Sequence, residues 1–284
     1  MSEGAFKFGP ESGLLGVYSD AGRGGDLCCL LINSGIVPRV GPHRMNVKIA
    51  RALAASGIDS LRFDLSGLGD SKPAAGALNY IDQAVSDIRA AMDFVEQHSG
   101  RKRRFAIFGI CSGAVNSYHA GLADDRLVGL LLLDGFWYRT PWTEPVRLWK
   151  RFRALSARRV LAAFKRKLRR TVKTPPPPRQ TRPEIFGTDG SGNLPPAEFA
   201  AGMNQLTARG AQVFLLYTAS ATGLVSYDAQ IPQAFRGQPF ARRIRSEARG
   251  DIDHTAVSQL YQQRMTKIVR DWVSDVDTRT RSAA

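Results

Sequence analysis

A cysteine between two glycines is the first feature of this sequence that could do chemistry. Gly109-Ile110-Cys111-Ser112-Gly113 follows an apolar run and precedes a helix-like segment. Glycines at these positions permit a tight turn that exposes the central side chain above a sheet, as in the G-x-S-x-G nucleophile elbow. A thiolate is a good nucleophile at neutral pH, and the N-terminal end of a following helix lowers the thiol pKa. Cys111 is the predicted nucleophile, and a buried structural cysteine is the alternative interpretation.

A histidine late in the chain is the predicted partner of this thiol. His254 lies in a loop between the last predicted strand and the last predicted helix. By contrast, His43 begins an early helix, His98 ends a polar helix, and His119 lies in the helix after Cys111. In enzymes with this type of elbow, the histidine follows the nucleophile and the acid in the sequence. We therefore predict that His254 is the general base, with an ordinary surface histidine as the alternative.

The elements that position these residues alternate between strands and helices. After an opening hairpin at 5–18, apolar runs predict strands at 27–32, 104–110, 127–133 and 211–217, and the repeated alternation with helices predicts two more strands at 59–65 and 241–247. Apolar residues at helical spacing predict helices at 42–57, 78–98, 112–123, 196–209, 228–236 and 256–274. Strands that are apolar on both faces and alternate with helices indicate a mostly parallel sheet covered on both sides. The fold class is therefore α/β.

One long segment interrupts this alternation. Apolar residues within 148–172 recur at spacings of three and four on strongly basic stretches, and four prolines at 175–178 end them. We interpret residues 136–195 as a basic helical lid over the carboxyl ends of the strands. The core domain then consists of residues 1–135 and 196–284.

Gly35 and the segments VGPHRMNVKIARALAASG, FDLSGLGDS, GICSGA and DHT carry a family resemblance. Together they resemble the α/β-hydrolase superfamily, most closely the serine-aminopeptidase-like hydrolases that accompany exosortase or exopolysaccharide gene sets. The resemblance covers residues 5–275 and is weakest in the predicted lid. It implies an eight-stranded sheet, a nucleophile at Cys111 and a base at His254. The sequence is also similar to dienelactone hydrolases, which use cysteine at the same elbow.

The resemblance also implies an oxyanion hole made of backbone groups. Such folds use the N–H group of the residue after the nucleophile, here Ser112, and one from the loop after an early strand, here Gly35 or Ile36. In the same loop, Arg39 and His43 are candidate substrate-binding residues, and a role in loop packing is the equal alternative.

The acid is missing where the resemblance implies it. Just after strand 211–217 the chain reads TASATGLVSY and has no carboxylate before Asp228. Three candidate acids remain. Asp228 lies far along the chain from this strand, and Asp253 adjoins His254 too closely to reach around to it. Asp134 ends the preceding central strand, a position from which an acid orients the histidine in some hydrolases. We favour Asp134, with a Cys-His dyad as an equal alternative because a thiol needs less help from a base than a hydroxyl does.

The positive charge is concentrated in the predicted lid. The net charge is +15, and twelve Lys and Arg residues with no acid lie between positions 147 and 173. No nucleic-acid-reading motif accompanies this charge, so nucleic acid is not expected. An acidic acyl carrier protein, a coenzyme-A-like thioester, an anionic glycan or a peripheral contact with an anionic membrane would complement it. A solvated basic face is the alternative.

Several classes of protein are disfavoured by what the sequence lacks. Cys28 and Cys29 lie in an apolar run, where cysteine acts as a small hydrophobic residue. No CxxC, HxxxH or HExxH spacing occurs, so neither a metal nor another cofactor is expected. Neither a signal-peptide pattern nor a transmembrane run of about 18 apolar residues occurs, so the expected location is the cytoplasm.

These features favour an enzyme that forms an acyl-cysteine. Its substrate would be an ester, thioester or lactone, either small or bound to a carrier protein, and it would act as a hydrolase, thioesterase, acyltransferase or cyclase. Two alternatives are open. One is a hydrolase-fold binding or scaffold protein with weakened catalysis, whose basic lid contacts an anionic membrane or partner. The other is a non-hydrolytic lyase on the same fold.

Overall fold

A mostly parallel sheet organises the molecule. The computed structural model describes residues 1–32, 35–154, 193–221 and 223–282. In this part of the chain the sheet has eight strands in the order β1-β2-β4-β3-β5-β6-β7-β8. The strands are β1 (Ser2–Phe8), β2 (Leu14–Asp20), β3 (Leu27–Leu31), β4 (Asp59–Phe63), β5 (Arg104–Ile110), β6 (Leu127–Leu133), β7 (Gln212–Thr218) and β8 (Arg245–Arg249). Strand β2 pairs antiparallel with β1 and β4, and the remaining pairs are parallel.

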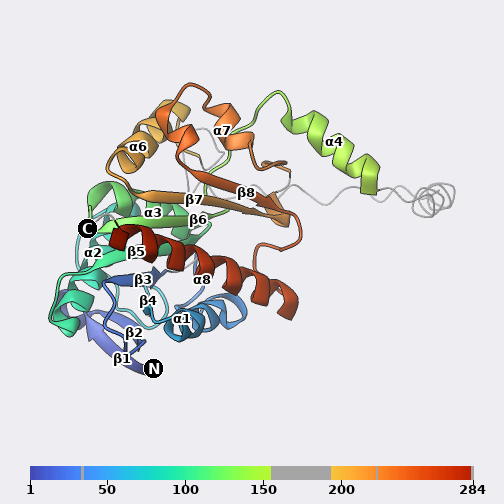
Figure 1. Ribbon diagram of the computed structural model, residues 1–284. Coiled ribbons are helices and arrows are strands. Elements are labelled where there is room, and N and C mark those ends of the chain that lie inside the picture. The colour runs from blue at the N-terminus through green and yellow to red at the C-terminus, as the bar shows by residue number, and fades with distance from the viewer. Residues whose placement is uncertain (33–34, 155–192, 222, 283–284) are drawn as a thin grey trace, which may run out of the picture.

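Helices cover both faces of this sheet (Figure 1). The helices of the described residues are α1 (Met45–Ala55), α2 (Tyr80–Ser99), α3 (Ser112–Ala123), α4 (Thr143–Ala154), α6 (Pro196–Ala208), α7 (Gln230–Ala234) and α8 (Gln259–Ser282), of which α4 does not lie on the sheet. Successive side chains of a strand point to opposite faces. In β5, accordingly, Phe105 and Ile107 belong to the core with α2, α3 and α6, whereas Ala106 and Phe108 belong to the core with α1 and α8. The predicted α/β-hydrolase fold is confirmed.

Two predicted boundaries near the C-terminus were wrong. Residues Pro239–Arg242 form a 3-10 helix, and the strand begins only at Arg245. Phe240 explains the shift, because it is fully buried against the aromatic cluster under α6 and α7. Helix α8 continues to Ser282 because Val276 still packs on the sheet, where it faces Gly129.

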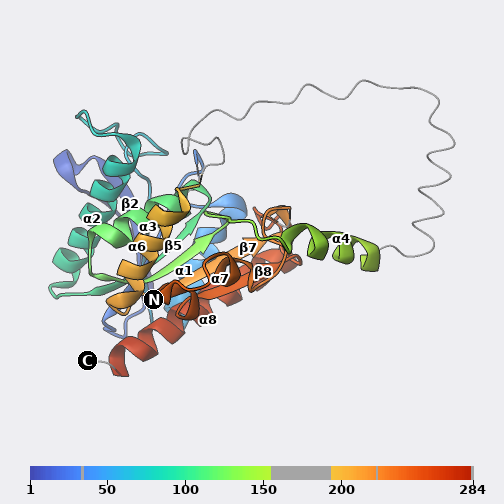
Figure 2. The same ribbon diagram turned by 90° about the horizontal axis from the view of Figure 1, so that it is seen from above.

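Only the two ends of the predicted lid, residues 136–154 and 193–195, are described. Helix α4 extends away from the sheet (Figures 1 and 2), while residues 155–192 lie outside the described part of the chain. The lid and the division into core and insertion therefore stay predictions. Among the described helices, none is long and apolar enough to cross a membrane.

Candidate active site

Cys111 occupies a sharp turn between β5 and α3. Its backbone has φ 55° and ψ −116°, a conformation that non-glycine residues adopt rarely and mostly at functional sites. Gly109 makes the turn possible, because a Cβ atom there would collide with the carbonyl group of Gly113 and with Ser117 Oγ. The thiol is exposed. This exposure contradicts the alternative that Cys111 is a buried structural cysteine, whereas Cys28 and Cys29 are fully buried in β3.

His254 reaches this turn from the loop between β8 and α8. Its ring lies beside the Cys111 thiol and lowers the pKa of that thiol, and Nδ1 lies 2.7 Å from Asp134 Oδ2. The His254 backbone N–H donates to Ser220 Oγ at 3.3 Å, which ties the loop to the segment after β7. The structure therefore brings the three predicted catalytic side chains together, with the histidine between the thiol and the carboxylate.

Asp134 lies directly after β6 and is held from the neighbouring strand β7. Its side chain is 7% exposed, and its backbone has φ 51°. Oδ1 accepts the backbone N–H of Thr218 at 2.8 Å, and Oδ2 accepts the Thr218 hydroxyl at 2.6 Å. This geometry favours a triad over a dyad. It also gives the other two candidate acids different contacts, since Asp228 accepts from Ala248 N–H and Asp253 caps the turn at residues 255–257.

The protonation states follow from these contacts. The hydrogen bond to Asp134, followed by that to Cys111, raises the pKa of His254 to about 10 from its usual 6.5. The hydrogen bond from His254 is the largest cause that lowers the pKa of Cys111, and the Ser112 N–H adds to it. Burial and the Asp134 charge oppose that shift. Both shifts favour transfer of the thiol proton to His254, that is, a thiolate–imidazolium pair.

The predicted oxyanion-hole residues border the thiol. The Ser112 N–H points at the Cys111 sulfur, at the start of α3 where the helix dipole also favours negative charge. The Gly35 N–H donates to Ser112 Oγ at 2.7 Å, so in this state it is not free for an oxyanion. Ile36 lies beside it on the exposed loop. Ser112 and Ile36 are thus the better candidate donors, and all three roles stay predictions.

The two candidate substrate-binding residues have different surroundings. The Arg39 guanidinium is bonded to Asp64 and lies 2.7 Å from the Asp70 carboxylate. The Arg39 backbone N–H also donates to Asp64 Oδ1 at 2.5 Å. These contacts favour the loop-packing alternative for Arg39. His43 is exposed at the start of the turn before α1, and its predicted role stays a prediction.

Thr218 and Ser220 belong to the site but were not predicted. Thr218 ends β7 and Ser220 follows it, in a segment whose notable sequence feature is the lack of an acid. A sequence signal for Thr218 would have required knowing that β7 runs beside β6 with Leu133 opposite Leu216, which places the two strand ends together.

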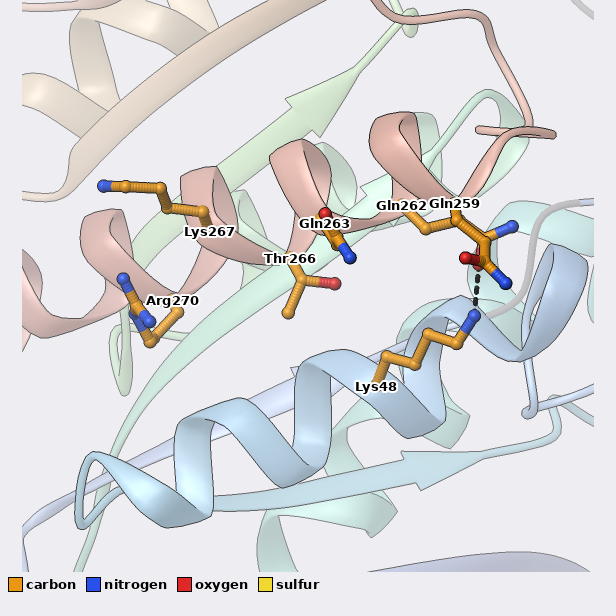
Figure 3. Close-up of a pocket in the computed structure, with 7 residues that line it drawn as sticks. All are labelled: Lys48, Gln259, Gln262, Gln263, Thr266, Lys267 and Arg270. Atoms are coloured by element: carbon orange, nitrogen blue, oxygen red, sulfur yellow. Dashed lines mark hydrogen bonds between the residues drawn. The ribbon is translucent and has the colours of Figure 1, made fainter.

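A separate surface hollow lies between α1 and α8 (Figure 3). Its cations already have partners: Lys48 bonds Gln262, and Lys267 and Arg270 bond Asp271. None of the predicted catalytic side chains lines it. It is therefore distinct from the candidate active site.

The fold and the elbow define an α/β-hydrolase-fold enzyme. In agreement, the family model described as serine aminopeptidase, S33, matches residues 36–186, which is more than half of the chain. The chain belongs to this family. The family is named for serine, whereas this chain has cysteine at position 111. No curated protein matches the sequence.

Solved structures with the same fold include several esterases. An esterase from Pyrococcus furiosus, Pf2001, is 14% identical with a TM-score of 0.61, covering 96% of this chain and 91% of that chain. Est1E from Butyrivibrio proteoclasticus is 12% identical with a TM-score of 0.55, covering 96% and 98%. XC6422 from Xanthomonas campestris, described as an α/β serine hydrolase without a lid, is 14% identical with a TM-score of 0.52, covering 96% and 94%. At these identities the similarity shows the fold alone.

Proposed function

We propose that this protein is a cysteine-dependent acyl-transfer enzyme that acts on an ester, thioester or lactone through an acyl-Cys111 intermediate. The observation that carries the proposal is the series of contacts from Cys111 through His254 to Asp134 at the carboxyl ends of the strands. A nucleophile, a base and a group that orients the base are the parts that covalent acyl transfer requires.

Acylation begins from the thiolate–imidazolium pair. The Cys111 sulfur attacks the carbonyl carbon, and the new oxyanion accepts hydrogen bonds from backbone N–H groups at Ser112 and the 35–36 loop. The tetrahedral intermediate collapses, the bond to the leaving group breaks, and the leaving oxygen or sulfur takes the proton from His254. The products of this half-reaction are an acyl thioester on Cys111 and a neutral His254.

Deacylation returns the pair to its starting state. Once the thiolate charge is consumed, the contribution of Cys111 to the raised His254 pKa is lost, and the neutral imidazole can accept a proton. It takes this proton from water, an alcohol or an amine as that group attacks the acyl carbon. The thiolate leaves with the bonding electron pair, and His254 keeps the proton. The acceptor decides whether the reaction is hydrolysis, transfer or cyclisation.

Steady-state kinetics with a panel of donors tests this proposal. The panel contains aryl esters, short-chain and medium-chain acyl coenzyme A, acyl carrier protein thioesters and lactones, each with and without added alcohol or amine acceptors. We expect turnover that is lost in Cys111→Ala and reduced in Cys111→Ser, because a serine hydroxyl is a weaker nucleophile than a thiolate and reacts only as His254 removes its proton. Wild-type turnover that survives in Cys111→Ala would contradict the proposal.

A second candidate function, contact with an anionic membrane, is favoured by helix α4. Trp149 and Phe152 are 56% and 72% exposed on this helix, and Trp142 before it is 64% exposed. Cations lie among them, and the Arg153 guanidinium stacks 4.7 Å from the centre of the Trp149 ring. Exposed aromatic side chains interleaved with Arg and Lys are typical of helices that lie in a bilayer interface.

Vesicle co-sedimentation distinguishes this function from a solvated basic face. We expect binding to vesicles that contain phosphatidylserine, weaker binding to pure phosphatidylcholine, and loss of binding with rising salt. The variant with both Trp149→Ala and Phe152→Ala should bind several-fold more weakly although its charge is unchanged. Equal binding of this variant and the wild type would refute insertion of the aromatic side chains. Binding to neither vesicle would remove the membrane proposal altogether.

A further inference from the structure

The end of strand β7 contributes to the candidate site without supplying a charged side chain. The residues there are Thr218, Ala219 and Ser220, at the place where the family resemblance implies the acid. Thr218 is only 1% exposed, and it lies beside Asp134 at the end of the neighbouring strand.

Both oxygens of the Asp134 carboxylate accept hydrogen bonds from Thr218. The backbone N–H and the hydroxyl of Thr218 donate to Oδ1 at 2.8 Å and to Oδ2 at 2.6 Å. His254 Nδ1 lies 2.7 Å from the same Oδ2. Two donors from one residue, one for each oxygen, fix the rotation of the carboxylate about its Cβ–Cγ bond, and this rotation decides whether Oδ2 faces the imidazole.

The same strand end holds both loops that carry the acid and the base. The Asp134 N–H donates to Leu216 O at 2.9 Å, and the hydroxyl of buried Tyr217 donates to the carbonyl oxygen of Phe136 at 2.7 Å. On the other side, Ala219 N–H donates to Ile252 O at 2.7 Å. The end of β7 therefore fixes the segments before His254 and after Asp134 relative to each other.

We propose that Thr218 is a positioning residue that orients the Asp134 carboxylate toward His254. Strand β7 is not followed by an acid of its own, but its last residue fixes the orientation of the carboxylate that follows β6. The catalytic meaning of the inference rests on the proposed function. The orientation itself can be measured on the free enzyme, without any substrate.

The ionisation of Cys111 depends on His254, and that of His254 depends on Asp134. The bond from Asp134 is the largest cause of the raised His254 pKa, and the bond from His254 is the largest cause of the lowered Cys111 pKa. A carboxylate that can rotate away from the imidazole weakens the first bond and therefore the second. Loss of the Thr218 hydroxyl should consequently be detectable as a change in the ionisation of the Cys111 thiol, although Asp134 and His254 lie between the two residues.

The experiment is a pH titration of Cys111 alkylation by iodoacetamide, read by mass spectrometry of the labelled peptide. The other two thiols interfere little, because burial raises the pKa of Cys28 to about 12 and that of Cys29 well above its usual value. Thr218→Val removes the hydroxyl and keeps the shape and the backbone N–H, whereas Thr218→Ser keeps the hydroxyl. We expect the midpoint to rise by about one pH unit in Thr218→Val and to stay within a few tenths of the wild type in Thr218→Ser.

A double-variant cycle separates positioning from a general structural effect. With Asp134→Asn already present, Thr218→Val should cause no further shift of the midpoint, since the carboxylate that it orients is gone. A shift of equal size in both backgrounds, or no shift in Thr218→Val alone, would overturn the proposal. If Thr218→Val does not fold, as judged by circular dichroism, Thr218→Ala takes its place in the same cycle.

The outcome is independent of the search for a substrate. If no acyl donor is turned over but the alkylation titrations of the Thr218 variants give the expected shifts, the proposed acyl transfer is rejected and the positioning role stands. If acyl transfer is observed but Thr218→Val leaves the titration unchanged, the positioning role is rejected and the acyl-transfer proposal stands.

Discussion

Replacing Asp134 by Asn tests which acid orients His254. The change is nearly isosteric and removes the negative charge that lies 2.7 Å from His254 Nδ1. The matched control is Asp228→Asn, because Asp228 is the first carboxylate after β7 and instead accepts the Ala248 N–H at 2.7 Å. The two variants therefore compare the acid that the structure favours with the one nearest to the place implied by the family resemblance.

The expected magnitude follows from the His254 pKa. Asp134 is the first cause and Cys111 the second cause of its rise from 6.5 to about 10. Removing the carboxylate should lower this pKa by about two units, since a neighbouring opposite charge accounts for shifts of one to three units. Because the imidazolium then stabilises the thiolate less, the pKa of Cys111 should rise towards its ordinary value.

The effect on thiol reactivity can also be bounded. A thiol of ordinary pKa is only about 3% ionised at pH 7, so complete loss of the pair lowers the thiolate fraction by up to about 30-fold. A thiolate of higher pKa is intrinsically more nucleophilic, which offsets part of this loss, so the alkylation rate should fall by less than the thiolate fraction does.

Two measurements check this prediction. One is a nuclear magnetic resonance titration of the His254 ring nitrogens, and the other is the rate of iodoacetamide alkylation at pH 7. We expect both to change in Asp134→Asn and neither to change in Asp228→Asn. An unaltered His254 titration in Asp134→Asn, or a large shift in Asp228→Asn, would refute the assignment of the acid.

Three further predictions concern stability. Gly109→Ala should lower the free energy of unfolding by about 2 to 3 kcal/mol, measured by urea denaturation, because its Cβ would collide with the backbone of α3. Arg39→Ala should lower it by about 3 kcal/mol with little change in KM, since it removes the guanidinium that is bonded to the fully buried Asp64 carboxylate. A raised KM at unchanged stability would instead indicate substrate binding. Because the pKa of His254 is raised on folding, its contribution to the free energy of unfolding is complete below pH 6.5 and is lost as the pH rises through about 10. Because the pKa of Cys111 is lowered on folding, its contribution is complete above pH 9.0 and is lost as the pH falls through the lowered pKa. Between pH 6.5 and 9.0, and above the lowered pKa of Cys111, the two slopes are opposite and cancel. The stability difference between the wild type and the variant with Cys111→Ala and His254→Ala should therefore be flat in that range and should decrease as the pH rises from 9.0 towards 10.

Much of the fold could be predicted because its pattern is local. Apolar runs such as 104–110 and 127–133 are buried on both faces of a parallel sheet, and their lengths are set by the runs themselves. The error at β8 has a tertiary cause. Its residues are charged and half-exposed, so hydropathy does not mark the strand, and Phe240 is held by aromatic side chains distant in the sequence.

The site was predictable to the extent that it depends on chain order. Cys111 and His254 were found from the elbow and from the position of the last loop. Asp134 was one of several open possibilities, because its proximity to His254 depends on the packing of β6 against β7 across 120 residues of sequence. Thr218 could not be found at all, since its role exists only through hydrogen bonds to a neighbouring strand.

The central claim is that Cys111 carries the acyl group, and intact-protein mass spectrometry tests it most directly. Wild-type enzyme is mixed with an activated acyl thioester, quenched in acid within milliseconds to seconds, and digested to locate any adduct. The account predicts one acyl group on Cys111, formed more slowly in His254→Ala and absent in Cys111→Ala. An adduct on another residue, or turnover of the same thioester without any acyl-Cys111, would contradict it.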